Sequence, residues 1–192
     1  SRSPTRRTAL AALALAATLP ATGRAQAPAP AFPAKPVTLV VPFAPGGPTD
    51  AMARILASAI KASLPQGMLV DNKPGAGGNI GAELVARAPA DGHTLLFGTS
   101  GPLAINTSLF SKINYDPIKS FAPVIRIGHL PNVLVVHPGV PVQNVRELIA
   151  YVRANPGKLS YASSGNGASS HLAGVLFNLR TGTDIQHVPY KG

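Results

Sequence analysis

The sequence contains neither cysteine nor tryptophan, and only seven of its 192 residues are Asp or Glu. The absence of cysteine excludes disulfide scaffolds, thiol catalysis and Cys-ligated metal sites. The acidic residues form no pair at helical spacing, so no acid–base dyad is predicted. The five histidines form no H-x-x-x-H or H-E-x-x-H pair. We therefore expect neither a metal nor a cofactor.

Familiar catalytic and nucleotide-binding motifs are also missing. The sequence has no G-x-x-x-x-G-K-[ST] phosphate loop and no G-x-S-x-G nucleophile elbow. Residues 165–167 resemble the start of a dinucleotide fingerprint, but Ser170 occupies the third glycine position and Asp184 follows too soon. This pattern favours a protein that binds without turnover, and not an enzyme.

The formal charge of +10 is concentrated near the N-terminus. Arg2, Arg6, Arg7 and Arg24 lie in the first 27 residues, which contain no acidic residue, and without them the charge is +6. The other Lys and Arg residues are scattered singly, without a basic stripe. Nucleic-acid binding requires clustered cations that face phosphates, so a mildly cationic protein that captures small anions is the simpler interpretation.

Residues 1–27 have the layout of a secretory signal peptide, rather than of a buried N-terminal helix. A basic start precedes a short apolar run, residues 9–19, and small residues occupy positions 25 and 27. The run is shorter than the ~20 residues that a membrane-spanning helix needs. Arg6 and Arg7 permit twin-arginine export, but the surrounding match is loose, so the general secretory route stays equally open. We expect a soluble, exported protein.

After a Pro/Ala-rich spacer at residues 28–36, strand and helix patterns alternate, which predicts an α/β fold with mainly parallel sheets. The expected strands are 37–41, 68–71, 94–98, 124–128, 133–137, 159–162 and 185–188. Four helices are expected. The first begins with Thr49 or Asp50 as N-cap and the second covers residues 79–88. The third begins at the capping-box pair Asn144 and Glu147, and the fourth covers residues 172–179.

Three strand-to-helix loops, residues 42–50, 98–106 and 163–171, are rich in Gly, Ser, Thr and Asn. In open α/β sheets, ligands bind beyond the carboxyl ends of strands, where glycines let backbone N–H groups approach and helix starts favour anions. For each loop the alternative is an ordinary turn or helix cap, and a lone histidine such as His171 is more often a packing residue. We expect the glycine-rich residues 75–81 to shape a turn and not to bind ligand.

Several motifs, in order and spacing, resemble the extracytoplasmic solute receptors of tripartite tricarboxylate transporters, the Bug family. They are PVTLVVPFAPGGPTD at 36–50, NKPGAGGNIG at 72–81, ADGHTLL at 90–96, YASSGNG at 161–167 with SHLAG at 170–174, and HVPYKG at 187–192. The resemblance implies a type II periplasmic-binding-protein fold, in which two α/β lobes close on a ligand. Lobe one would span 37–124, and residues 125–192 would start an incomplete lobe two.

The resemblance also implies which residues bind ligand. In such receptors, a carboxylate is held by backbone N–H groups, hydroxyls and bridging waters. The implied ligand-binding positions are Ala44, Gly46, Gly47, Thr49, Asp50, Thr99, Ser100, Asn106, Ser163, Gly165, Gly167, Ser169 and His171. Pro48 departs from the residue that many relatives have there, which puts the details of that loop in doubt.

The function so implied is a periplasmic, monomeric receptor that captures a dicarboxylate, tricarboxylate or related organic acid. Its partners would be the membrane subunits of a tripartite tricarboxylate transporter, and no nucleic acid. Two alternatives stay open. One is a sensor that presents its ligand-bound form to a signalling partner. The other is a serine/histidine hydrolase in which His171 activates a serine, although the sequence offers no third group to orient it.

Overall fold

The first sheet is built around one fully buried strand. The computed structural model describes residues 31–191, so the predicted signal peptide lies outside the described residues. Strand β1 (Val37–Val41) pairs in parallel with β2 (Met68–Asn72) on one side and with β3 (Thr94–Leu96) on the other. Val40 and Val41 are 0% exposed. The near-continuous apolar run is therefore confirmed as a central parallel strand.

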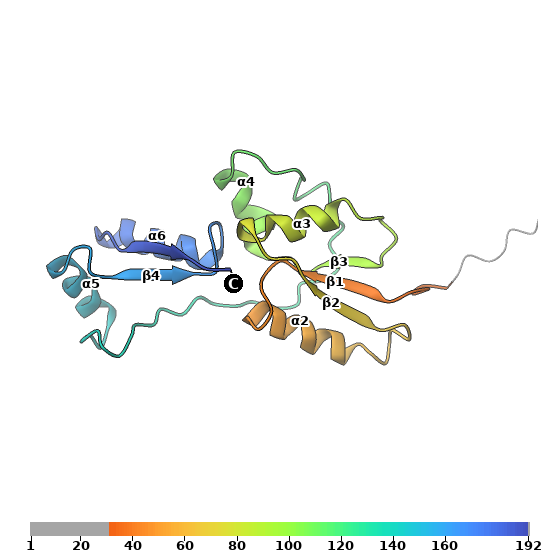
Figure 1. Cartoon of the computed structure of the whole chain (residues 1–192), viewed down its shortest axis with the longest axis horizontal. Coiled ribbons are helices and arrows are strands. Elements are labelled where there is room, and N and C mark those ends of the chain that lie inside the picture. Colours follow the sequence, from red (N-terminus) through yellow and green to blue (C-terminus); the bar gives the residue numbers. More distant parts are fainter. Residues whose placement is uncertain (1–30, 192) are drawn as a thin grey trace, which may run out of the picture. The chain divides into compact units, whose positions relative to one another are not determined.

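Two helices cover opposite faces of this sheet (Figure 1). Helix α2 (Pro48–Ala59) contacts β1 and β2, whereas α3 (Asn79–Ala86) contacts β1 and β3. Leu39, Val41 and Phe97 form the core on the α2 side together with Ala53. Because the strand order β2-β1-β3 reverses at β1, the fold provides the crevice at the carboxyl ends of the strands where α/β proteins bind ligands.

Helix α2 begins earlier than the sequence suggested. Gly47 is its N-cap and Pro48 is its first helical residue, so the prediction of Thr49 or Asp50 as the N-cap was wrong. Proline suits the first helical position because its fixed φ matches the helix and its missing N–H would be unpaired there anyway. The side chain of Asp50 is thereby placed inside the first turn, where it takes a different role.

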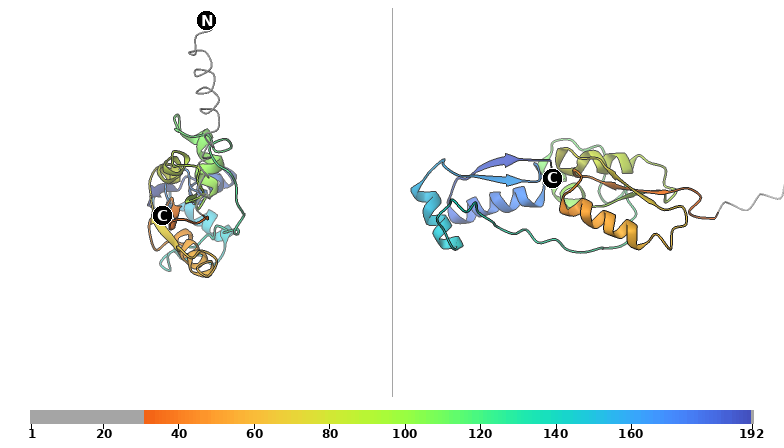
Figure 2. Two further views of the ribbon diagram at one scale, coloured as in Figure 1. Left: turned by 90° about the vertical axis from the view of Figure 1, so that its right-hand side faces the viewer. Right: turned by 60° about the horizontal axis from the view of Figure 1, so that its bottom comes forward.

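A second parallel sheet contains strands β4 (Ser160–Ser163) and β5 (Gln186–Pro189). Helix α6 (Ser169–Thr181) connects them and lies along both, as Figure 2 shows. Helix α5 (Val145–Ala154) precedes β4, and its N-cap Asn144 accepts a hydrogen bond from the backbone N of Glu147 at 3.0 Å. The predicted N-cap is therefore confirmed, while the Glu147 carboxylate accepts from the backbone N of Gln143 at 2.7 Å and not from that of Asn144.

The two strands expected at residues 124–128 and 133–137 do not form. Residues 121–137 have no regular secondary structure, and their apolar side chains are open to solvent, with Val124 80% and Val135 79% exposed. A strand requires a neighbour that pairs with its backbone N–H and C=O groups. Among residues 31–191 no strand pairs with this segment. These two predictions were wrong for that reason, while the lobe boundary at residue 124 stays a prediction.

Three short elements were not expected from the sequence. They are the 3₁₀ turn η2 (Ala76–Gly78), the π-turn η3 (Gly101–Ile105) and the single turn α4 (Asn106–Leu109). Segments of three to five residues are too short to show an apolar period, so sequence patterns do not reveal them. In the described part of the chain, no helix has both the length and the apolar character that crossing a membrane requires.

Candidate functional site

A pocket of about 290 Å³ lies where the carboxyl ends of four strands meet. Phe43 follows β1, residues 75–78 follow β2, residues 164–166 follow β4, and residues 190–191 follow Pro189, which ends β5. Phe110, at the end of α4, completes the lining. A second hollow is bounded only by residues 144–147 in the first turn of α5, so it brings no separate elements together. The pocket at the strand ends is the better candidate site.

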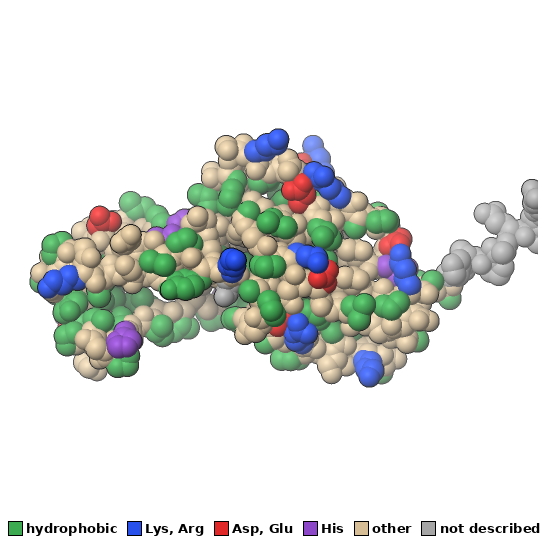
Figure 3. Space-filling view, viewed as in Figure 1, with side chains coloured by type: hydrophobic (Ala, Val, Ile, Leu, Met, Phe, Trp, Pro, Cys, Tyr) green, Lys and Arg blue, Asp and Glu red, His purple; other side chains and the backbone are tan. Residues whose placement is uncertain are grey.

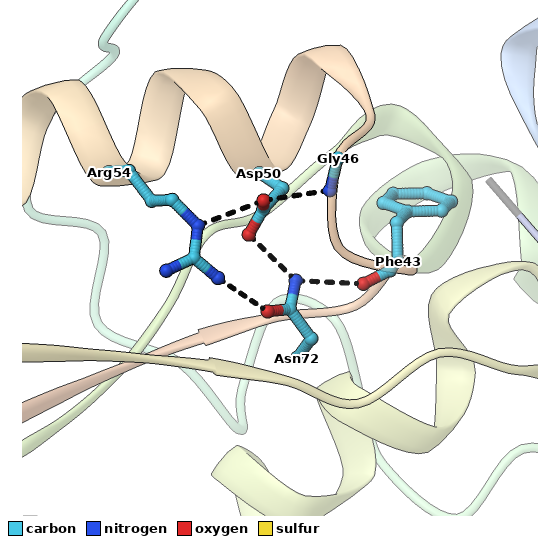
Figure 4. A network of polar contacts seen from close by, with 5 residues as sticks. All are labelled: Phe43, Gly46, Asp50, Arg54 and Asn72. Carbon is cyan, nitrogen blue, oxygen red and sulfur yellow. Dashed lines mark hydrogen bonds and ion pairs between the residues drawn. The ribbon is translucent and has the colours of Figure 1, made fainter.

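Asp50 shapes the loop after β1 from inside the protein. Its Oδ2 accepts hydrogen bonds from the backbone N of Gly46 at 2.9 Å and from Arg54 Nε at 2.9 Å (Figure 4). Asn72 Nδ2 donates to Asp50 Oδ1 at 2.9 Å and to the carbonyl oxygen of Phe43 at 3.1 Å. Asp50 is only 3% exposed. The network thus holds Phe43, which lines the pocket, and Gly46, farther along the same loop.

This network also keeps Asp50 ionised. The hydrogen bond from Arg54, followed by those from Gly46 and Asn72, holds the pKa of the Asp50 carboxyl well below its usual range. A permanently charged carboxylate would repel an anionic ligand at close range, but here its charge is satisfied by three donors. We therefore interpret Asp50 as a positioning residue for the loop.

The glycine-rich segment after β2 lines the pocket as well as turning the chain. Residues 75–78 all have positive φ, including Ala76 at 48° and Gly77 at 61°. The turn into α3 that the sequence predicted is present, and the same residues form one wall of the pocket. A Cβ atom on Gly77 would lie 2.1 Å from the carbonyl oxygen of Asn166. Glycine is therefore required where this wall meets the loop after β4.

Asn106 contacts both the segment 75–78 and the loop after β4 from the protein interior. It is 0% exposed, and its Nδ2 donates to the carbonyl oxygen of Gly77 at 3.1 Å and to Asn79 Oδ1 at 2.6 Å. A Cβ on Gly167 would lie 2.1 Å from Asn106 Oδ1. The Tyr115 hydroxyl lies 2.9 Å from Asn79 Oδ1, and burial, followed by the charge of Glu83, raises the pKa of Tyr115 to about 12. Asn106 therefore supports the pocket from the protein interior.

The loop after β4 is held by hydroxyl and imidazole groups. The backbone N of Gly165 donates to Ser163 Oγ at 3.1 Å, and Ser163 Oγ lies 2.6 Å from His187 Nε2 on β5. The backbone N of Gly167 donates to His171 Nδ1 at 3.3 Å. Ser163 is 7% exposed, so its hydroxyl acts within the loop.

The predicted site residues occupy two positions relative to the pocket. Gly165 lines it directly. Ala44 joins its rim because the backbone N of Ala44 donates to the carbonyl oxygen of Lys191 at 3.3 Å. The others are not among the lining residues: Gly46, Gly47, Thr49, Asp50, Thr99, Ser100, Asn106, Ser163, Gly167, Ser169 and His171. The hydroxyl of Thr99 is buried without a hydrogen-bond partner among the described residues.

Sequence reasoning missed part of the lining. Residues 75–78 carried a usable signal, since they directly follow a strand and precede a helix, as the other three loops do. Lys191 is the one charged residue among the described lining residues. Its sequence signals were its position after a strand and its place in the motif at 187–192. Phe110 had none, because it reaches the pocket through α4, which no pattern predicted. Among residues 31–191, no three His, Asp or Glu side chains are placed to hold a metal ion.

The fold is that of an α/β protein with parallel sheets, and its candidate site is the pocket at the carboxyl ends of the strands. The family model described as the tripartite tricarboxylate transporter family receptor, TctC, matches residues 52–192, and the chain belongs to this family. It is 45% identical over 187 residues to the UPF0065 protein in the tcbD-tcbE intergenic region of Pseudomonas sp. strain P51, covering 97% of this chain and 55% of that protein. Protein BugT of Bordetella pertussis is 44% identical over 84% of this chain and 50% of its own length.

Solved structures show the same relationship. Rpa4515 of R. palustris, solved with adipate, has a TM-score of 0.81 and 44% identity, covering 84% of this chain and 54% of its own. MatC of Rhodopseudomonas palustris, solved with bound malate, has a TM-score of 0.79 and 37% identity, covering 84% of this chain and 55% of its own. The chain therefore has the fold of periplasmic binding proteins, and it spans about half the length of the relatives it matches.

Proposed function

We propose that this protein is an extracytoplasmic receptor that captures a small dicarboxylate or a related organic acid, without catalysing a reaction. The observation that carries the proposal is the pocket itself, in which glycine-rich backbone, a serine hydroxyl and one lysine converge at the ends of four parallel strands. Two family members of known structure hold adipate and malate. Both ligands are small dicarboxylates, and the pocket volume suits a molecule of that size.

The residue types suit a carboxylate. Glycine backbone lines the pocket at Gly75, Gly77 and Gly165, where no side chain intervenes. Neutral donors hold an anion without the desolvation cost of a buried ion pair. The lysine adds a single positive charge at the rim, whereas Phe43 and Phe110 supply an apolar wall for a methylene chain. Of the positions named from the sequence, we propose Gly165 and Ala44 as ligand contacts and the others as their supports.

The membrane subunits of a tripartite tricarboxylate transporter are the proposed partners, the periplasm is the proposed location and a monomer is the proposed state. Membership of the receptor family supports the transporter partners, and solved neighbours described as periplasmic support the location. A hydrolase is less favoured, because Ser163 is buried and its hydroxyl is already shared between Gly165 and His187.

The test is thermal denaturation of the full chain at pH 7.5 with adipate, malate or the uncharged diamide of adipate. A ligand that binds only the folded state at 100 times its Kd adds about 2.7 kcal/mol of stability. We expect an increase in Tm with one or both acids and none with the diamide. Equal shifts with adipate and its diamide, or no shift with any acid, would contradict carboxylate recognition.

A pair of lysine variants refines this test. Lys191→Met is expected to weaken acid binding several-fold, because it removes the charge at the pocket. Lys158→Met is the matched control, since Lys158 Nζ donates to Asn155 Oδ1 at 3.0 Å beyond the end of α5 and does not line the pocket. Equal weakening in both variants would point to net charge and not to this site.

A further inference from the structure

Two histidines hold the loop after β4, and their rings stack on each other. The ring centroids of His171, on α6, and His187, on β5, are 4.2 Å apart with an interplanar angle of 24°. Tyr161, on β4, stacks on His187 at 4.9 Å and 29°. The hydroxyl of Tyr161 donates to the carbonyl oxygen of His171 at 3.3 Å. The cluster therefore connects the two strands of the second sheet, β4 and β5, with helix α6.

Each histidine bonds a different end of the loop. His187 Nε2 lies 2.6 Å from Ser163 Oγ, which in turn accepts from the backbone N of Gly165. His171 Nδ1 accepts a hydrogen bond from the backbone N of Gly167. We propose that this pair is a proton-operated clasp, which holds residues 163–167 while both rings are neutral and releases Gly167 when His171 takes up a proton.

The chemistry of the two bonds decides which one breaks. An imidazole nitrogen that accepts a hydrogen bond carries no proton, so neutral His171 has its proton on Nε2. Protonation places a second N–H at Nδ1, directly opposite the N–H of Gly167, and the acceptor is lost. The contact between Ser163 and His187 survives protonation of His187, because a serine hydroxyl can accept as well as donate. His171 is therefore the releasing group.

The surroundings of the pair do not stabilise a cation. His171 from α6 and Tyr161 from β4 both stack on the ring of His187, and the Tyr161 hydroxyl reaches the backbone carbonyl of His171, not its ring. Within residues 31–191, no acidic side chain forms an ion pair with either ring. Burial and, second to it, the neighbouring His171 lower the pKa of His187. Once one of the two stacked histidines is protonated, its positive charge therefore opposes protonation of the other.

Release of the loop would alter the pocket, since Gly165 and Asn166 line it. The open loop binds more protons than the closed one, so acid favours opening by linkage. The inference therefore adds a regulation of the proposed site, in which ligand affinity falls as pH falls towards 5. This consequence rests on the proposed function, whereas the clasp itself does not.

The test is a proton and nitrogen NMR titration of the full chain between pH 8 and 5, without ligand. We expect the ring signals of His171 and the amide signal of Gly167 to change with one common midpoint. The exchange protection of the Gly167 amide should fall about fivefold or more across it, the effect of losing one ordinary hydrogen bond. A Gly167 amide that shows no step while His171 titrates would overturn the proposal.

Two variants complete the design. His171→Gln keeps a side-chain acceptor that does not titrate, so the Gly167 signal should lose its pH step. His129→Gln is the matched control, because His129 is exposed in the segment 121–137 and belongs to neither stacked ring pair, so this variant should keep the step. Should His171→Gln fail to fold, the common midpoint in the unmodified chain decides the matter alone. Failure of the carboxylate test at pH 7.5 would leave this result unaffected, so the two proposals fail separately.

Discussion

Val37–Val41 and Val133–Val136 are apolar runs of similar composition with opposite environments. The first is central strand β1, where Val37, Leu39, Val40 and Val41 are at most 3% exposed. In the second run, Val133 is 76% and Val135 is 79% exposed, and no regular structure forms. The difference shows that an apolar run indicates only that burial would be favourable, and not that it occurs. Burial itself requires strands on both sides and a helix above, which β2, β3 and α2 supply for β1 alone.

Exposed apolar side chains are also visible on the surface of the protein. Apolar side chains lie open among polar ones on the face drawn in Figure 3, where the Lys and Arg side chains stand singly. The apolar residues of 121–137 and of the outer side of α6, such as Leu179 at 76%, contribute to the exposed apolar area. Isolated apolar residues on a surface are ordinary, but a run of this length in one segment is not.

The largest expected effect comes from placing one carboxylate in each run. Val40→Asp buries an unpaired charge in the first sheet and should destabilise the fold by about 4 kcal/mol or more. Val135→Asp, the matched control, leaves its charge in water and should stay within about 0.5 kcal/mol. Urea denaturation of the two variants measures both values. Similar losses would mean that residues 133–136 are buried in solution, which would break the comparison.

A smaller effect separates two glycines with similar φ angles. Gly77 has φ 61° and Gly157 has φ 73°, but a Cβ would meet the Asn166 carbonyl oxygen at 2.1 Å in the first case and nothing within 4 Å in the second. Gly157→Ala should cost about 1 kcal/mol for its strained φ. Gly77→Ala should cost about 2–4 kcal/mol, because overpacking adds to the same strain. Equal losses in denaturation would show that the pocket walls separate easily.

The smallest effect concerns Asp50 and its dependence on pH. Because the folded-state pKa of Asp50 is lowered, its contribution to stability is complete above the unfolded value of about 3.9 and is lost as pH falls below it. Asp50→Asn should therefore lower Tm by a few degrees at pH 7, and the difference from the unmodified chain should shrink below about pH 4. Asp184→Asn, exposed beyond α6, should change Tm little at either pH. If the Tm difference between Asp50→Asn and the unmodified chain did not change with pH, the charge of Asp50 would not contribute to stability.

Local sequence signals predicted most of the regular elements. The buried run of β1, the apolar spacing of α2 and the Asn144–Glu147 pair were sufficient because each depends on residues close in the chain. The α/β class followed from the alternation of those elements. The candidate site was harder, since Phe110 lies just outside the loops that the sequence singled out and Lys191 lies in a family motif with no binding role assigned to it. Both reach the pocket only through the fold. Asp50 and Asn106 had the polar character of ligand-binding residues, and only their hydrogen bonds reveal a supporting role.

The sequence by itself determined the positions of the glycines, the caps and the apolar runs, because backbone freedom, capping and local hydrophobic spacing are properties of neighbouring residues. The family was also readable there, as the motifs keep their order and spacing. Only the tertiary structure decided which apolar run became a central strand, and which loops met to form the pocket. Both depend on pairing between segments far apart in the chain, such as residues 75–78 with 164–167, and the patterns along a single strand or helix do not encode that pairing.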